Sequence, residues 1–375
     1  MNRVVVFRVD ASLQMGTGHV MRCLTLADAL RVAGAKCEFI CRAHPGNLLD
    51  LIRSQGYLTH ELAVVQDRSG ADVSGYKAES GEQSTAHGDW LGASQAEDAA
   101  ACEPIVAKLH PDWLVVDHYA LDARWEQALK HHCHRLMVID DLADRSHVCD
   151  LLLDQTFGRQ VKDYRARMPG DCQLLCGSQY ALLRPEFAAQ RPYSLQRRVK
   201  PQLRQLLISM GGVDKDNATG RVLDALRGCP LPDDCRITVI MGSTAPWLSE
   251  VKQQAISMPW ATEVLVGVSD MARLMADSDL AIGAAGATSW ERCCLGLPTI
   301  MLVLADNQRQ VAQGLEQSKA ARIIEKLQDI GSCLPDLLRH LTQHPASLQF
   351  MSRSARRIVD GRGVNTVVHL MESLP

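Results

Sequence analysis

The sequence lacks the features of disulfide scaffolds, nucleic-acid-binding proteins and membrane proteins. Its 13 cysteines include no C-x-x-C pair, and an odd cysteine number in a chain of 375 residues indicates reduced thiols. An excess of positive charge is also lacking, because 40 basic and 43 acidic residues give a net charge of −3, so neither nucleic acid nor an anionic membrane is expected as a partner. The most apolar stretch, 297–305, is half the length of a membrane span, and Arg3 and Arg8 interrupt the first ten residues. We therefore expect a soluble, cytoplasmic protein that acts on a small solute.

What remains is the composition of a globular protein with more than one domain. Hydrophobic residues make up 46% of the chain and charged residues 22%, which are globular averages. Short β-branched segments alternate with helical patterns in two series, which predicts two α/β lobes with parallel sheets. The expected strands are 4–9, 37–41, 113–117 and 136–140 in the first series, and 206–209, 237–241, 264–266, 280–283 and 299–304 in the second.

The expected domain boundary lies in a basic, proline-containing segment at 188–204. We expect a first lobe at 1–195, a second lobe at 196–345, and C-terminal helices at 346–375 that pack across the hinge. The segment 66–94 is rich in glycine, serine and charge and has little periodicity. Loops of this kind are functional lids or disordered segments, and the sequence leaves both interpretations open.

The first expected strand leads into a glycine turn, Gly16-Thr17-Gly18, that opens a helix at His19. Small residues at this position let backbone N–H groups approach a ligand. A dinucleotide-binding fingerprint would need glycine where Met21 stands, and the chain has no P-loop motif. Because the helix dipole disfavours the protonated imidazole, we predict that His19 is neutral and acts as a general base. The alternative is that His19 only caps the helix or fills space.

A second glycine turn follows the expected strand 280–283 and opens another helix. It contains Gly286, Ala287, Thr288 and Ser289, which offer room, amides and hydroxyls to a diphosphate. Glu291 follows, and an acid at this point can accept hydrogen bonds from both hydroxyls of a ribose. The alternative is a capping box with small residues for tight packing.

Other polar residues stand at the ends of expected strands, where open α/β sheets bind ligands. Asn307 and Gln308 could hold a sugar, although Asp306 or Asn307 could instead be an ordinary helix N-cap. In the first lobe, 117–119 (Asp-His-Tyr) and 140–141 (Asp-Asp) occupy such ends. Adjacent strand residues point to opposite faces, so the two aspartates of 140–141 are not expected to act as a pair.

Two further patterns are interpreted as structural. Neighbouring positions in 131–134 (His-His-Cys-His) are expected to diverge around a solvated helix end, so no metal site is predicted. The closely spaced cysteines are expected to be buried small hydrophobic side chains.

Taken together, several segments resemble the UDP-sugar hydrolases of pseudaminic acid biosynthesis, relatives of the lipid-intermediate N-acetylglucosaminyltransferase of peptidoglycan assembly. The resemblance rests on these segments: FRVDASLQMGTGHVMRCLTLA at 7–27, DHY at 117–119, IDDL at 139–142, YALLRPEF at 180–187, SMGGVD at 209–214 and GATSWER at 286–292.

The resemblance implies a glycosyltransferase-B architecture, with two Rossmann-like lobes facing a central cleft. It implies hydrolysis of UDP-2,4-diacetamido-2,4,6-trideoxy-β-L-altropyranose to UDP and the free sugar, with inversion at the anomeric carbon. Position by position, His19 matches the catalytic histidine and Glu291 the ribose-binding acid. Ser289 lies in the diphosphate turn, and Tyr119 and Asn307 match groups that line the sugar site.

We expect no cofactor and no metal, because helix ends and amides can offset the charge of the leaving diphosphate. Asp10 is a candidate for orienting His19. A transferase of the same fold, with an alcohol as acceptor in place of water, is the main alternative. A non-catalytic nucleotide-sugar-binding protein is the second. The sequence does not fix the oligomeric state.

Overall fold

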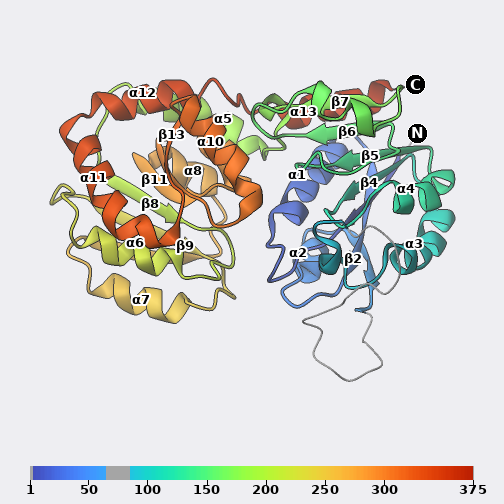
Figure 1. Cartoon of the computed structure of the whole chain (residues 1–375), viewed down its shortest axis with the longest axis horizontal. Coiled ribbons are helices and arrows are strands. Elements are labelled where there is room, and N and C mark those ends of the chain that lie inside the picture. The colour runs from blue at the N-terminus through green and yellow to red at the C-terminus, as the bar shows by residue number, and fades with distance from the viewer. Residues whose placement is uncertain (1–2, 65–84, 375) are drawn as a thin grey trace. The chain divides into compact units, whose positions relative to one another are not determined.

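The structure is a computed structural model that describes residues 3–64 and 85–374 (Figure 1). The chain forms two compact units, one of Met1–Tyr180 with Asn365–Pro375 and the other of Ala181–Val364. Below they are called unit 1 and unit 2. In the described part of the chain, no helix is long and apolar enough to cross a membrane.

Unit 1 is built on a seven-stranded parallel sheet with the order β3-β2-β1-β4-β5-β6-β7. Its strands are β1 (Val4–Val9), β2 (Lys36–Arg42), β3 (Leu58–Leu62), β4 (Trp113–Asp117), β5 (Arg135–Ile139), β6 (Leu151–Asp154) and β7 (Gln173–Cys176). Its α-helices are α1 (Gly18–Val32), α2 (Leu49–Ser54), α3 (Gln95–Leu109) and α4 (Ala123–Leu129), followed at the C-terminus by most of α13 (Gly363–Ser373). Short 3₁₀ turns are η1 (Gly88–Leu91), η2 (Lys130–His132), η3 (Val161–Asp163), η4 (Arg165–Arg167) and η5 (Ser178–Tyr180).

Unit 2 is built on a six-stranded parallel sheet with the order β10-β9-β8-β11-β12-β13. Its strands are β8 (Gln205–Ser209), β9 (Arg236–Met241), β10 (Ala261–Val266), β11 (Leu280–Ala284), β12 (Thr299–Leu302) and β13 (Ala321–Ile324). Its helices are α5 (Pro185–Arg197), α6 (Ala218–Leu226), α7 (Leu248–Ile256), α8 (Met271–Asp277), α9 (Thr288–Cys294), α10 (Arg309–Gln317), α11 (Ile330–Gln343) and α12 (Ala346–Ala355), with the 3₁₀ turns η6 (Asp306–Gln308) and η7 (Leu327–Asp329).

Both sheets have apolar strands because helices cover both of their faces. The inner strands β1, β4, β8 and β11 are almost fully buried, as continuous β-branched and leucine-rich segments require in a parallel sheet. Each sheet also reverses its order next to its first strand, between β1 and β4 in unit 1 and between β8 and β11 in unit 2. Ligands of open α/β sheets bind beyond the carboxyl ends of the strands at such a reversal.

The predicted fold class, two parallel-sheet α/β lobes, is confirmed, and some details differ. The strands β3, β6, β7 and β13 were not predicted, and the strand expected at 299–304 ends at Leu302. The contacts divide the chain after Tyr180, so helix α5, most of which was assigned to the first lobe, belongs to unit 2. The C-terminal helices belong to different units, because α12 lies in unit 2 and Asn365–Pro375 in unit 1. Trp113 donates a hydrogen bond from Nε1 to the carbonyl of Met371, which ties α13 to β4 within unit 1.

Most of the segment 66–94, for which the sequence left a lid and disorder open, lies outside the described residues. From Thr85 on, it contains the 3₁₀ turn η1, and Ser94 caps the start of α3 in a capping box with Glu97.

Candidate functional site

The glycine turn after β1 places His19 in the first turn of α1, at the sheet reversal of unit 1. Gly16 has a φ of +76°, a conformation that side chains disfavour, and its N–H bonds to the Ser12 carbonyl at 2.8 Å. A Cβ at Gly18 would meet no atom within 4 Å, so packing does not require glycine there. The N-cap residue Thr17 makes no side-chain hydrogen bond to the helix, and the His19 ring bonds to Asp117 at the end of β4 and not to the helix start. The helix-cap interpretation of His19 is therefore wrong.

Asp117, at the carboxyl end of β4, is the partner of His19. His19 Nδ1 lies 2.6 Å from Asp117 Oδ1, and Arg22 holds the same carboxylate through Nε at 2.6 Å and Nη2 at 2.7 Å. Burial would raise the pKa of Asp117, but Arg22 and His19 hold it below its usual range, so the group is a carboxylate. A carboxylate only accepts hydrogen bonds, so Nδ1 carries the proton and Nε2 of a neutral ring keeps its lone pair.

The other ring nitrogen of His19 is available to a ligand. Among the described residues Nε2 has no hydrogen-bond partner, and it is absent from the fully buried polar atoms that lack one. The His19 side chain is 9% exposed, which leaves a small opening to solvent. This geometry suits a base that takes a proton from a small molecule.

Asp10, the predicted orienting group, does not have this role. It binds Arg8 at 2.6 Å and the Arg42 N–H at 2.6 Å, and its other oxygen faces His118 Nε2 at 3.4 Å. Strands β1 and β4 are adjacent in the sheet, and the carboxylate within hydrogen-bond distance of His19 is that of Asp117, at the end of β4.

Aromatic side chains lie beside His19: Tyr119 contacts its ring, and two further rings contact Tyr119. Tyr119 contacts the His19 ring edge-on with ring centroids 4.5 Å apart and donates its hydroxyl to Asp141 at 2.8 Å. His87 and Trp90, from the turn η1, lie 5.5 and 6.0 Å from the Tyr119 ring. Burial lowers the pKa of His87, which keeps this ring neutral near pH 7. Rings of this kind present apolar faces to a ligand.

In unit 2 the predicted diphosphate turn lies between β11 and α9, again at the sheet reversal. Ser289 N–H bonds to the Gly286 carbonyl at 2.9 Å and starts the helix, while Ala287 makes no side-chain cap. The capping-box interpretation is therefore wrong. A Cβ at Gly286 would meet no atom within 4 Å, so the tight-packing explanation also fails at this residue. Tight packing does require Gly283, where a Cβ would lie 2.2 Å from Arg292 Nη1.

Ser289 and Glu291 differ in what they can offer. Ser289 is buried, and its hydroxyl accepts from Arg292 Nη2 at 3.2 Å, so its side chain supports the turn from inside. Glu291 is half-buried, and no hydrogen bond of its carboxyl group is found among the described residues. Burial raises the pKa of Glu291 to about 7. Both carboxyl oxygens are available to a ligand, as a ribose-binding acid requires.

The two polar residues after β12 are placed differently from each other. Gln308 Oε1 accepts from the Leu304 N–H at 3.0 Å and so fixes the loop. Asn307 is exposed in η6, and Asp306 pairs with Arg309 at 2.9 Å without capping α10. Asn307 therefore remains a candidate sugar ligand.

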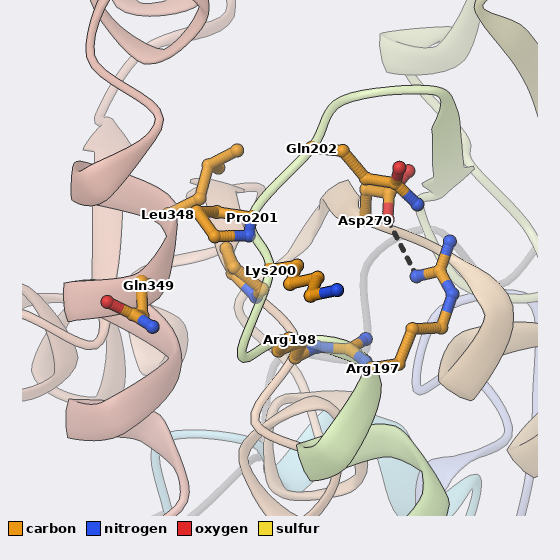
Figure 2. A pocket seen from close by; sticks show the side chains of 9 residues that line it. Arg197, Arg198, Lys200, Pro201, Gln202, Asp279, Leu348 and Gln349 are labelled. Atoms are coloured by element: carbon orange, nitrogen blue, oxygen red, sulfur yellow. Dashed lines mark ion pairs between the residues drawn. The ribbon is translucent and has the colours of Figure 1, made fainter.

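A pocket elsewhere in unit 2 has no predicted site residue in its lining. It is lined by the residues of Figure 2 together with Pro298. Its basic side chains are largely engaged: Arg197 pairs with Asp279 at 2.6 Å, and the terminal nitrogens of Arg198 donate to carbonyls such as that of Ser278 at 2.8 Å. It offers an anion little that is free to bind.

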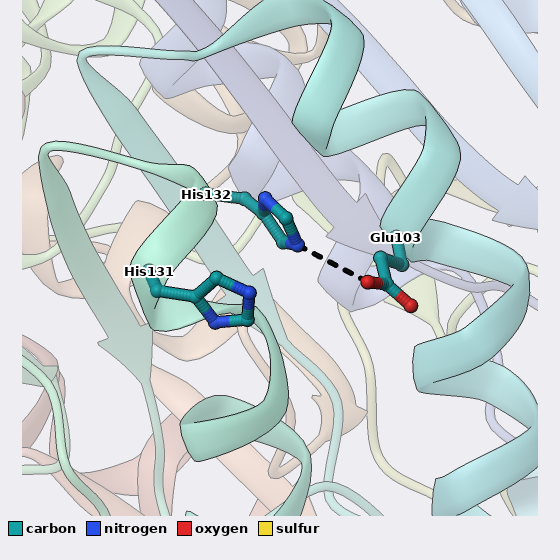
Figure 3. Close-up of side chains that lie close together, drawn as sticks. All are labelled: Glu103, His131 and His132. Atoms are coloured by element: carbon teal, nitrogen blue, oxygen red, sulfur yellow. Dashed lines mark hydrogen bonds and ion pairs between the residues drawn. The ribbon is translucent and has the colours of Figure 1, made fainter.

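The histidines at 131–132 do not diverge as expected. Their ring centroids lie 3.8 Å apart, and His132 Nε2 is 3.3 Å from Glu103 Oε1 of α3. Figure 3 shows His132 pointing at the Glu103 carboxylate.

Comparisons with known proteins show what this chain is similar to in sequence and in fold. Residues 205–363 match the family model of the glycosyltransferase family 28 C-terminal domain. The crystal structure of MurG from Acinetobacter baumannii is similar with a TM-score of 0.68 over 100% of both chains, at 16% identity. The fold is thus that of the glycosyltransferase-B type, and within it residues 205–363 are similar to the glycosyltransferase family 28 C-terminal domain.

Individual relatives give finer names, which belong to those proteins. The spore coat polysaccharide biosynthesis protein SpsG of Bacillus subtilis is 28% identical to this chain over the matched part. The match covers 56% of this chain, and it spans only 62% of the length of SpsG. The UDP-2,4-diacetamido-2,4,6-trideoxy-β-L-altropyranose hydrolase of Campylobacter jejuni is 24% identical over 83% of this chain and 95% of its own length.

Sequence reasoning placed Asp141 at a strand end where ligands bind, but it missed Arg22, His87 and Trp90 as parts of the candidate site. Arg22 had a usable signal, because it stands three residues after His19 and therefore on the same helix face. His87 and Trp90 had none, since their segment has no periodicity that would place it.

Proposed function

We propose that the protein hydrolyses a UDP-linked deoxy-amino sugar, UDP-2,4-diacetamido-2,4,6-trideoxy-β-L-altropyranose, to UDP and the free sugar. His19 is the general base in this proposal. The observation that carries it is the 2.6 Å contact of His19 Nδ1 with Asp117, which leaves Nε2 to face solvent. The relationship to the Campylobacter jejuni hydrolase supports the choice of substrate.

In the proposed reaction a water molecule attacks the anomeric carbon. His19 Nε2 takes a proton from that water, the bond from the anomeric carbon to the diphosphate oxygen breaks, and UDP leaves with the electron pair. Attack opposite to the leaving group inverts the anomeric configuration. Asp117 fixes the ring and stabilises the imidazolium as it forms, and Arg22 fixes Asp117.

The nucleotide is assigned to unit 2 in this proposal. Glu291 accepts hydrogen bonds from the two ribose hydroxyls, and the turn from Gly286 to Ser289 faces the diphosphate. The open space at Gly286 supports this. Neither packing nor a positive φ requires glycine at this position, and a larger side chain would fill the space in front of the turn. The N–H groups of Ser289 and Trp290 bond to the carbonyls of Gly286 and Ala287, so in this proposal the diphosphate binds the preceding N–H groups of the turn, because the first N–H groups of a helix bind anions.

A sugar transferase is the second candidate, and the family 28 match and the MurG-like fold favour it. The same base would then take the proton of an acceptor alcohol. The two reactions separate cleanly when the enzyme is given a UDP-sugar without an acceptor.

The test offers a panel of UDP-linked deoxy-amino sugars without acceptor and follows UDP release and the anomeric configuration of the product by NMR. Prompt release of UDP with an inverted free sugar supports hydrolysis. Strict dependence on an added alcohol supports transfer, and UDP-sugar binding without any turnover supports a binding protein.

The base is tested with His19→Asn, which should fold and bind UDP normally while hydrolysis falls about 10²- to 10⁴-fold. His110→Asn is the control, because His110 is exposed and its φ of 40° is one that asparagine adopts readily. Equal turnover in the two variants would remove His19 from the mechanism.

A further inference from the structure

The chain carries a cluster of metal-ligating side chains that the proposed reaction does not use. Glu103 of α3 and His131 and His132 of η2 each offer one ligand atom, and these atoms all lie within 4.8 Å of one another. We propose that these three residues bind a zinc ion, with water in the fourth position. This proposal is independent of the proposed function.

The separation of the ligand atoms fits the size of the ion. Two ligands bound at 2.0–2.2 Å to a tetrahedral ion lie roughly 3.3–3.5 Å apart. His132 Nε2 and Glu103 Oε1 are 3.3 Å apart, which already matches. His131 is exposed, and no hydrogen bond of its ring is found in the described part of the chain, so a small rotation brings its nitrogen to the ion at little cost.

The donor set selects the class of metal. Two imidazole nitrogens and one carboxylate suit Zn²⁺, whereas Mg²⁺ and Ca²⁺ prefer oxygen ligands throughout. The adjacent thiol does not compete, because Cys133 Sγ is half-buried and lies 3.5 Å from the Lys130 carbonyl.

The position in the fold points to a structural role for the ion. The turn η2 leads into the start of β5, next to the start of β4, whereas His19 and Asp117 meet at the carboxyl end of β4. The ion would therefore be held at the amino ends of the strands, whereas the candidate base lies at their carboxyl ends. There it would link η2 to α3, the helix whose Asp98 binds Arg8 in the core of unit 1.

The experiment uses full-length protein without a polyhistidine tag, stripped of metal, in a Cys333→Ser background, since Cys333 is an exposed thiol. Isothermal titration with Zn²⁺ should give one site per chain. Glu103→Gln, His131→Asn and His132→Asn should each weaken binding about tenfold or more. The control is His134→Asn, because His134 is an exposed histidine of the same segment outside the cluster, and it should bind Zn²⁺ like the parent.

Thermal unfolding gives a second measurement. Zinc at about a hundred times its dissociation constant should raise the Tm of unit 1 by about 5 °C or more in the parent and in His134→Asn, and not in a variant with all three substitutions. Absence of a 1:1 site overturns the proposal. So does zinc affinity that any one of the three single substitutions leaves unchanged.

Discussion

Glu291→Gln should make the protein more stable at pH 8 while weakening its affinity for UDP. The reason is that Glu291 is a half-buried carboxyl group with no hydrogen-bond partner among the described residues, and burial raises its pKa to about 7. In the unfolded chain a glutamate titrates at about 4.3. Because the folded state binds the proton more tightly, ionisation of Glu291 costs stability as the pH rises from about 4.3 to 7, and the full cost remains above that range.

The size of the effect follows from the shift. A difference of about 2.5 to 3 pH units at about 1.36 kcal/mol per unit sets an upper limit of about 4 kcal/mol. The carboxyl group keeps some contact with water, so we expect about 1–2 kcal/mol. Glutamine has nearly the same shape and cannot ionise. For a unit of this size the gain amounts to a Tm increase of roughly 2–8 °C at pH 8 and almost none at pH 4.5.

The assay is calorimetric unfolding of wild type and Glu291→Gln at both pH values, with UDP titrated into each protein at pH 8. The loss of charge-assisted bonds to the ribose should weaken UDP binding about tenfold. Glu325→Gln is the matched control in unit 2, because Glu325 is exposed and the same substitution should change neither quantity. A Glu291→Gln variant that is less stable at pH 8, or that binds UDP like wild type, would refute the assignment of a ligand-binding acid.

Three further substitutions test unit 1. Asp117→Asn should keep the UDP affinity but lower kcat about 10²- to 10⁴-fold, measured by UDP release, because Nδ1 of His19 loses the acceptor that fixes its proton, and it should also lower the free energy of unfolding, because the buried Arg22 loses its carboxylate. Trp90→Ala should raise KM for the UDP-sugar about two- to tenfold with an unchanged Kd for UDP, and an unchanged KM would remove this ring from the sugar site. Asp98→Asn should lower the free energy of unfolding by about 3–5 kcal/mol in denaturant titrations, because Arg8 and Arg42 share this buried carboxylate. Burial would raise the pKa of Asp98, but the two arginines hold it at about 2. A loss below about 1 kcal/mol would contradict this account.

The sequence was sufficient to predict the two parallel sheets, because strands buried on both faces are written as continuous apolar segments. It failed for the edge strands β3, β7 and β13, which are partly exposed and carry polar residues such as His60 and Arg322. It also failed for β6, which is buried but only four residues long. Their place in the sheet is decided by pairing with a neighbouring strand, which no local pattern records.

The candidate site was predictable where one segment supplies it. The turns at Gly16–His19 and Gly286–Glu291 each combine a strand end, glycines and a helix start, and all of these are visible in the sequence. The partner of His19 was not predictable in the same way. Asp10 is close in sequence, but Asp117 is close in space, and only the order of β1 and β4 in the sheet distinguishes them. The same limit explains why His131 and His132 were not paired with Glu103.

The surroundings of His19 bear on the choice between water and an alcohol as the attacking molecule. Only 9% of the His19 side chain is exposed, and its ring contacts Tyr119, on which His87 and Trp90 pack. An acceptor alcohol attached to a sugar or a lipid has to bring its oxygen within hydrogen-bond distance of Nε2 through that opening, whereas a water molecule has no substituent to accommodate. On this ground we propose water as the attacking molecule, and the assay without acceptor tests that choice, whereas the family 28 match covers residues 205–363 of unit 2 and does not distinguish the two reactions.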